Sequence, residues 1–270
     1  MNTTIIALVA GALIGVSLGA LGGGGSILAV PVLVYALGQG PVEATTGSLF
    51  VVGVTSLAGT VVAWRAGRLL PGPGVAFGLI AIGGASAGAV ASAHVSAAAL
   101  LAAFAVLMLV VGVVMAWRQF QTGTETDRPF LSEPIIAFRP SFACQCPRAV
   151  KVLISALGVG LLTGFLGVGG GFLVVPALLL ALSLPMRYAV GTSLLVITMT
   201  SLAALLVRGA SDLQPDWWPV ILLTAASAVG GVLGLKLAGL VPPRALSGVF
   251  TVLVLGVAAY TAWQALPAVI

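Results

Sequence analysis

The chain has 270 residues, of which 60% are hydrophobic and only 6% are charged, and its formal net charge is +5. A soluble domain carries about 25% charged residues, so this composition excludes a protein whose whole surface faces water. It indicates a polytopic membrane protein, with the lipid bilayer as its surroundings. Because the backbone must satisfy its own hydrogen bonds there, only helices or a closed barrel remain. Long apolar runs without polar alternation favour an all-α fold.

The positive charge would suggest a nucleic-acid partner in a soluble protein, but here the basic residues stand between apolar segments, where they set membrane topology. We therefore expect no nucleic-acid partner. The two cysteines, Cys144 and Cys146, lie in one loop and are too few for a disulfide framework. The sequence contains no phosphate-binding loop of the ATPase type. We expect no enzyme activity, and no catalytic residue, metal site or cofactor.

Eight apolar segments follow one another along the chain, and two of them are longer than the rest. The segments cover residues 4–38, 44–64, 74–93, 97–117, 149–183, 189–207, 218–240 and 245–266. The first and the fifth have roughly 35 residues, whereas a straight crossing of the bilayer needs about 20. We predict three regions, namely a first transmembrane repeat over 1–117, a cytoplasmic linker loop over 118–148 and a second transmembrane repeat over 149–270.

The two long segments each contain a run of glycines, and the two runs are in register. Residues 22–31 read GGGGSILAVP and residues 167–176 read GVGGGFLVVP, at a spacing of 145 residues. The match extends to Ser48 and Ser193 and to a TSLA sequence in each half. Glycines and prolines that recur at one spacing indicate an internal duplication.

Two arrangements of the halves remain open. If each long segment crosses once, there are eight segments, and eight of the 11 Lys and Arg residues lie on one side. If each long segment runs in and back around its glycines, there are ten elements arranged as inverted repeats. Every Lys and Arg except Arg208 then lies on one side. The positive-inside rule prefers the second arrangement, and both place the 118–148 loop in the cytoplasm.

The glycine runs predict breaks in the helices, because each glycine costs roughly 1 kcal/mol of helix propensity relative to alanine. Consecutive N–H groups without side chains can converge on an anion, and the N-terminus of the following helix adds partial positive charge. We predict that the two breaks face each other and bind a small anion, with nearby hydroxyl groups as further donors. The candidate residues are Gly22, Gly24, Gly25, Ser26, Thr46, Ser48, Gly167, Gly169, Gly170, Gly171, Thr192 and Ser193.

Other glycines and the isolated cations have simpler interpretations. Glycines four residues apart, such as Gly15 and Gly19, are typical of closely packed membrane helices. We interpret Arg68 as a topology anchor and Arg187 as an interfacial residue. Lys236 either extends to the interface or neutralises a bound anion.

The second half reads GLLTGFLGVGGGFLVVP followed by AVGTSL, and the first half reads GVSLGALGGGGSILAVP followed by ATTGSL. This repeated pattern resembles the TauE/SafE sulfite exporter family. The first half departs from it, with Thr46-Gly47-Ser48 where the second half has Gly191-Thr192-Ser193. The resemblance implies a secondary transporter of the cell inner membrane for a small sulfur-containing anion of the sulfite, thiosulfate or organosulfonate class.

Two alternatives stay open beside a transporter. One is a passive anion channel. The other is a membrane-embedded sulfur-transfer component that uses Cys144 and Cys146, since a thiolate can bind a soft metal or exchange sulfur. The sequence leaves the oligomeric state, the direction of transport and the coupling ion open.

Overall fold

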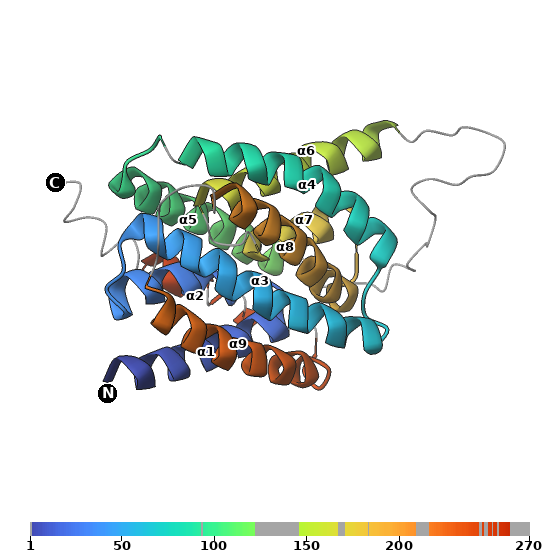
Figure 1. Ribbon diagram of the computed structural model, residues 1–270. Helices are drawn as coiled ribbons and strands as arrows, with labels where there is room; N and C mark the ends of the chain where they lie inside the picture. The colour runs from blue at the N-terminus through green and yellow to red at the C-terminus, as the bar shows by residue number, and fades with distance from the viewer. Residues whose placement is uncertain are drawn as a thin grey trace.

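The computed structural model describes residues 2–92, 94–121, 146–166, 171–182, 184–208, 216–242 and parts of 245–259. In this part of the chain every regular element is a helix (Figure 1). The elements are α1 Asn2–Leu21, α2 Ser26–Pro31, the π-helix η1 Val32–Ala36, α3 Pro41–Arg65, α4 Pro71–Ser92, α5 Ala97–Gln121, α6 Cys146–Leu166, α7 Gly171–Ala181, α8 Met186–Arg208 and α9 Trp217–Ala238. Five of these helices are long and apolar enough to cross a membrane. The predicted all-α polytopic fold is confirmed.

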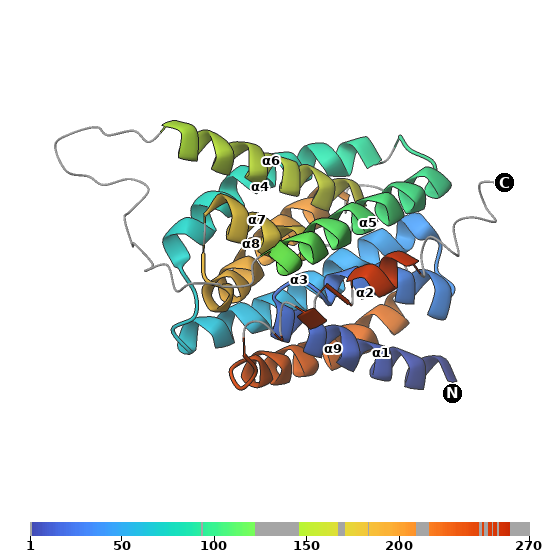
Figure 2. The ribbon, with the colours of Figure 1, turned by 180° about the vertical axis from the view of Figure 1, so that it is seen from behind.

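The long helices lie roughly along one direction and form a single bundle (Figures 1 and 2). Helices α1, α3 and α9 run away from the end where the N-terminus lies, whereas α4, α6 and α8 run back toward it. The helices that the sequence alignment pairs, such as α1 with α6 and α3 with α8, therefore run in opposite directions. These are the directions that the arrangement with ten elements requires.

The spaced glycines lie where two pairs of parallel helices touch. A side chain at Gly15 would overlap the carbonyl oxygen of Ser227, so that α1 packs directly on the backbone of α9. In the same way, Gly160 and Gly164 of α6 contact the carbonyl oxygens of Ala81 and Ala85 on α4. The expected packing role of these glycines is confirmed. Each interface joins a helix of one half to a helix of the other, so the halves interlock.

Helices α3 and α8 cross at the centre of the bundle, and their contact carries buried hydroxyl groups. Thr198 Oγ1 donates to Ser56 Oγ across the interface at 3.0 Å. Ser201 is fully buried beside Gly53. A Cβ atom added to Gly53 would lie 3.4 Å from the Cβ of Ser201. Most other hydroxyls bond carbonyls of their own helix, as Thr200 does with Val196 at 3.0 Å. Polar side chains therefore tie the two halves together inside the bundle.

After α1 the chain turns back on itself. A side chain at Gly25 would overlap the carbonyl oxygen of Ile14, so α2 starts against the last turns of α1. The segment then returns to the end from which α1 began, because Gln39 Nε2 donates to the carbonyl oxygen of Asp216 at 3.0 Å, just before α9. Residues 4–38 thus run out along α1 and return through α2 and η1.

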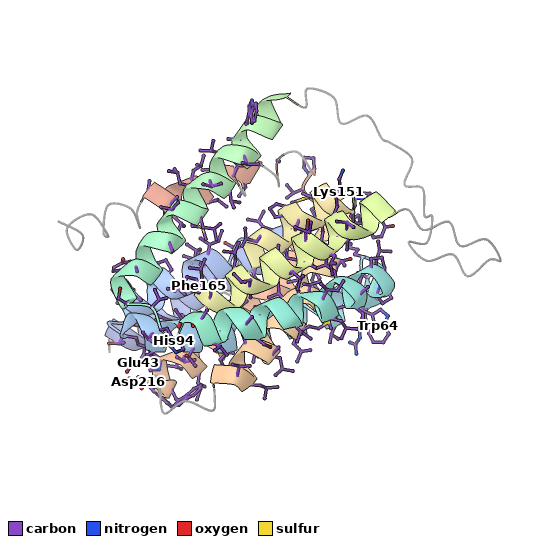
Figure 3. The ribbon with its side chains drawn as sticks, turned by 90° about the horizontal axis from the view of Figure 1, so that it is seen from above. Glu43, Trp64, His94, Lys151, Phe165 and Asp216 are labelled. Atoms are coloured by element: carbon purple, nitrogen blue, oxygen red, sulfur yellow. The ribbon has the colours of Figure 1, made fainter. Side chains whose placement is uncertain are left out.

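The two ends of the bundle carry different charges. The acids Glu43 and Asp216 lie at one end together with His94, whereas the cation Lys151 lies at the other end together with Trp64 (Figure 3). Of the predicted linker loop 118–148, residues 118–121 belong to α5 and residues 146–148 to α6. The residues between them lie outside the described part of the chain.

Candidate functional site

The first glycine run, residues 22–25, separates α1 from α2 and is buried throughout. Gly22 has φ +71°, and its N–H donates to the carbonyl oxygen of Leu18 at 2.8 Å, which closes the last turn of α1. A Cβ atom on Gly22 would lie 2.7 Å from the Cα of Val190 on α8. Both the backbone conformation and the close contact require glycine here.

The polar groups of this break are arranged asymmetrically. Among the described residues, the N–H groups of Gly23, Gly24 and Gly25 find no hydrogen-bond acceptor. The carbonyl oxygens of Gly22 and Gly23, in contrast, accept hydrogen bonds from Ser193 Oγ at 2.6 Å and from Ser26 Oγ at 2.7 Å. Carbonyls that would repel an anion are therefore engaged, while successive N–H groups stay open, as in the backbone nests that bind anions.

In this structure the hydroxyl groups of Ser26 and Ser193 bond backbone carbonyls. A hydroxyl group has only one proton to donate, and both Ser26 and Ser193 direct theirs to carbonyls of the break in this structure. Ser193 is also within 2.8 Å of the carbonyl oxygen of Val190. The predicted role of both hydroxyls as donors to an anion stays a prediction.

The second half reaches this break through Gly171, the first residue of α7. A Cβ atom on Gly171 would lie 2.9 Å from the Cα of Gly23 and 3.0 Å from the Oγ of Ser26, the first residue of α2. The N-terminal ends of the two short helices therefore meet in the interior, with Ile197 of α8 beside them. Two helix N-termini that face each other both favour negative charge between them.

The other predicted residues lie elsewhere or outside the described chain. Thr192 Oγ1 accepts a hydrogen bond from the N–H of Leu70 at 3.2 Å and so supports the loop between α3 and α4. Thr46 and Ser48 lie in the first turns of α3, where their hydroxyls approach the carbonyl oxygens of Val42 and Thr45 at 3.5 and 2.9 Å. Gly167, Gly169, Gly170 and Cys144 lie outside the described residues.

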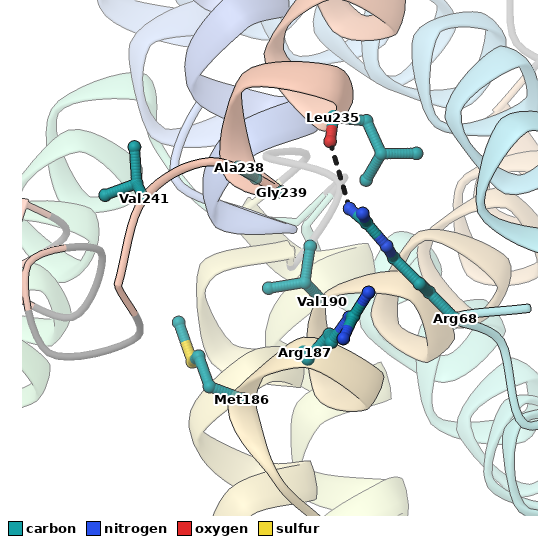
Figure 4. Close-up of a pocket in the computed structure, with 8 residues that line it drawn as sticks. All are labelled: Arg68, Met186, Arg187, Val190, Leu235, Ala238, Gly239 and Val241. Atoms are coloured by element: carbon teal, nitrogen blue, oxygen red, sulfur yellow. Dashed lines mark hydrogen bonds between the residues drawn. The ribbon is translucent and has the colours of Figure 1, made fainter. Parts of the chain in front are cut away.

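A pocket opens next to the break, at the end of the bundle where Lys151 lies. It has a volume of about 160 Å³ and is lined by Arg68, Arg187 and Val190, among others (Figure 4). The same Val190 contacts Gly22, so one residue separates the pocket from the break. Within the described residues, no group of three or more His, Cys, Asp or Glu side chains could hold a metal ion.

Comparison with known proteins gives the family. A family model described as sulfite exporter TauE/SafE matches residues 7–261. The chain belongs to the TauE/SafE family. Two relatives from Xylella fastidiosa, strains Temecula1 and 9a5c, are each named "Probable membrane transporter protein". They are 32% and 33% identical over 268 residues, which cover 98% of this chain and 97% of each relative.

A shorter match comes from Bacillus subtilis strain 168. Its "Probable membrane transporter protein YunE" is 35% identical over 79 residues, which is 29% of this chain and 29% of the relative. No solved structure matches this TauE/SafE protein. The family and the apolar helices together make it a multi-pass membrane protein.

The two arginines of the pocket in this TauE/SafE chain are not among the residues that the sequence predicts for the site, because Arg68 has the position of a topology anchor and Arg187 that of an interfacial residue. A signal was present in the spacing of α8. Arg187, Val190 and Ser193 follow one another at three-residue intervals, which places them on one face of a helix. A cation that lies one helical turn from a residue lining the break is therefore a candidate for the same site.

Proposed function

We propose that this TauE/SafE protein is a secondary transporter of the inner membrane, with the 118–148 loop in the cytoplasm. Its substrate is a small sulfur-containing anion of the sulfite, thiosulfate or organosulfonate class, bound between the two glycine-rich breaks. Family membership and the names of the relatives support membrane transport. The observation that carries the binding site is the set of open N–H groups at residues 23–25 beside the N-terminus of α7.

The chemistry of the break suits an oxyanion. Sulfite and sulfonate groups present three oxygens around one sulfur, and successive backbone N–H groups can each approach a different oxygen. The buried setting strengthens these hydrogen bonds, because the local dielectric is low. The acids in the described residues, Glu43 and Asp216, lie at one end of the bundle rather than at the break.

The contacts across the break also suit alternating access. Gly22 and Ser26 belong to one half and Ser193 and Gly171 to the other, so the site lies on the surface where the halves meet. Rocking one half against the other would open this surface to one side of the membrane at a time, as in other transporters with broken helices.

Ser193→Ala should weaken substrate binding. The change leaves the buried carbonyl of Gly22 without its hydroxyl donor, a loss worth about 1–3 kcal/mol, and restores partial negative charge to the break. We expect the KM for anion uptake into proteoliposomes to rise on the order of tenfold. Thr224→Val is the matched control, because Thr224 Oγ1 bonds only Val220 of its own helix, at 2.6 Å. An unchanged KM for Ser193→Ala would contradict the assigned role.

Transport assays with labelled anions test the function itself. Purified protein in proteoliposomes should take up labelled sulfite, thiosulfate or a sulfonate with saturation, and internal unlabelled anion should accelerate uptake by counterflow. Linear, non-saturating flux without counterflow would identify a passive channel instead. Recovery of a modified sulfur compound, lost in a Cys144→Ser, Cys146→Ser double variant, would identify sulfur transfer. Absence of flux for all three anions would contradict the proposed substrate class.

A further inference from the structure

The pocket at the end of the bundle where Lys151 lies contains two arginines, and membrane topology alone does not explain both of them. Its lining includes the guanidinium groups of Arg68 and Arg187, together with Met186, Val190 and Leu235 (Figure 4). An arginine that only fixes topology needs to reach the interface, and need not share a cavity with a second arginine. Two like charges around one small pocket repel each other unless something negative lies between them.

The hydrogen-bonding capacity of these arginines is only partly used. Arg68 Nη1 donates to the carbonyl oxygen of Leu235 at 3.4 Å, near the C-terminus of α9. Arg68 Nε is buried and has no partner among the described residues. Arg187 is exposed, and no ion pair to it is found in the described part of the chain. The described acids, Glu43 and Asp216, belong to the opposite end of the bundle (Figure 3).

The pocket lies next to the glycine break, and Val190 stands between them. Val190 forms part of its lining, and the Cα of Val190 lies against Gly22. The carbonyl oxygen of Val190 and that of Gly22 share the hydroxyl group of Ser193, at 2.8 and 2.6 Å. An anion that leaves the break toward this end would have to pass Val190 before it reaches the two guanidinium groups.

We propose that Arg68 and Arg187 form a second binding site for a small oxyanion, separate from the glycine break and next to it. Guanidinium groups bind the oxygens of sulfur and phosphorus oxyanions in pairs, with a planar geometry that lysine does not provide. The site receives the anion on its way to or from the break. That position on the transport path rests on the proposed function, whereas the binding itself does not.

Arg187→Gln tests this site, and Arg65→Gln is its matched control. Arg187 is preferable to Arg68, because Arg68 also bonds α9 and its loss could disturb the fold. Arg65 is likewise an exposed arginine at the same end of the bundle, but it does not line the pocket. Equilibrium dialysis with labelled sulfite and labelled sulfate, on full-length protein in a neutral detergent, measures binding of both anions without transport.

We expect two classes of site in the wild-type protein. Arg187→Gln should weaken one class at least tenfold and reduce its sensitivity to ionic strength, because only the charge of Arg68 remains. Arg65→Gln should bind as the wild type does. Arg187→Lys, which keeps the charge, should recover only part of the affinity. Identical isotherms for Arg187→Gln and Arg65→Gln would overturn the proposal.

A variant of the break separates this inference from the proposed function. Gly171→Val should remove the other class of site and leave the arginine class intact. If Gly171→Val abolishes binding while Arg187→Gln has no effect, the proposed function stands and the second site is wrong. If Arg187→Gln weakens binding while Gly171→Val binds as the wild type does, the second site stands and the glycine break is not the substrate site.

Discussion

Replacing Gly171 with valine should abolish anion transport in a protein that still folds. Even the first carbon of a side chain would lie 2.9 Å from the Cα of Gly23, 3.0 Å from Ser26 Oγ and 2.8 Å from Ile197 Cδ1. The two helix N-termini must separate to admit it, and in the proposed site the N–H groups would then no longer converge on one anion. We expect uptake into proteoliposomes to fall at least 100-fold for valine and roughly tenfold for alanine. These losses correspond to increases of about 2.7 and 1.4 kcal/mol in the activation free energy of transport.

Gly158→Val is the control for this experiment. Gly158 also lies in a helix of the second half, α6, but a Cβ atom there meets nothing within 4 Å. This variant should transport like the wild type and should elute at the same volume in gel filtration. Normal uptake by Gly171→Val, at normal protein levels, would show that the contact between the breaks is dispensable.

Gly164→Leu should prevent stable folding, in contrast to substitutions at the break. A side chain at Gly164 would overlap the carbonyl oxygen of Ala85 and would lie 2.8 Å from the backbone nitrogen of Ala89. Rigid backbone cannot move aside as a side chain can, so α6 must separate from α4 along their whole contact. Overpacking costs about 1–3 kcal/mol where side chains can adjust, and more against backbone.

Thermal unfolding of the purified protein measures this effect. We expect Gly164→Leu to give little monodisperse protein, with a clearly lower unfolding temperature for what remains. Gly158→Leu, on an open face of the same helix, should keep the wild-type unfolding temperature. Equal stability of the two variants would mean that α4 and α6 do not pack through their glycines.

The sequence predicts much of the fold, because local patterns determine it. The glycine run predicts the break that lies between Leu21 and Ser26, and the spaced glycines predict close helix contacts. Which helices make these contacts could not be predicted. The partner of α1 is α9, from the other half of the chain, and that pairing depends on how the halves interlock rather than on any local pattern.

The site was predicted less completely than the fold. A glycine run can be read from the sequence, so the break after α1 and the close approach of Gly171 to it were predicted, whereas anion binding by these glycines stays a prediction. The direction in which a hydroxyl group donates its proton cannot be read from the sequence. The structure shows that Ser26 and Ser193 donate to backbone carbonyls. Thr192 lies in the motif next to Ser193, yet one step along a helix turns its side chain toward Leu70.

The most direct test of the anion site observes the glycine N–H groups themselves. In protein made with glycine labelled by carbon-13 and nitrogen-15, an HNCO spectrum detects only glycines that follow another glycine. Of the 36 glycines, these are Gly23, Gly24, Gly25, Gly84, Gly170, Gly171 and Gly231. Gly84 and Gly231 lie inside helices, against neighbouring helices, and serve as internal references.

Addition of sulfite, or of whichever anion the transport assay selects, should move the amide signals of residues 23–25 downfield. The shift should reach half of its maximum at about the concentration that half-saturates transport, and the signals of Gly84 and Gly231 should stay in place. If the signals of residues 23–25 do not move at anion concentrations that saturate transport, the anion does not bind at the glycine break.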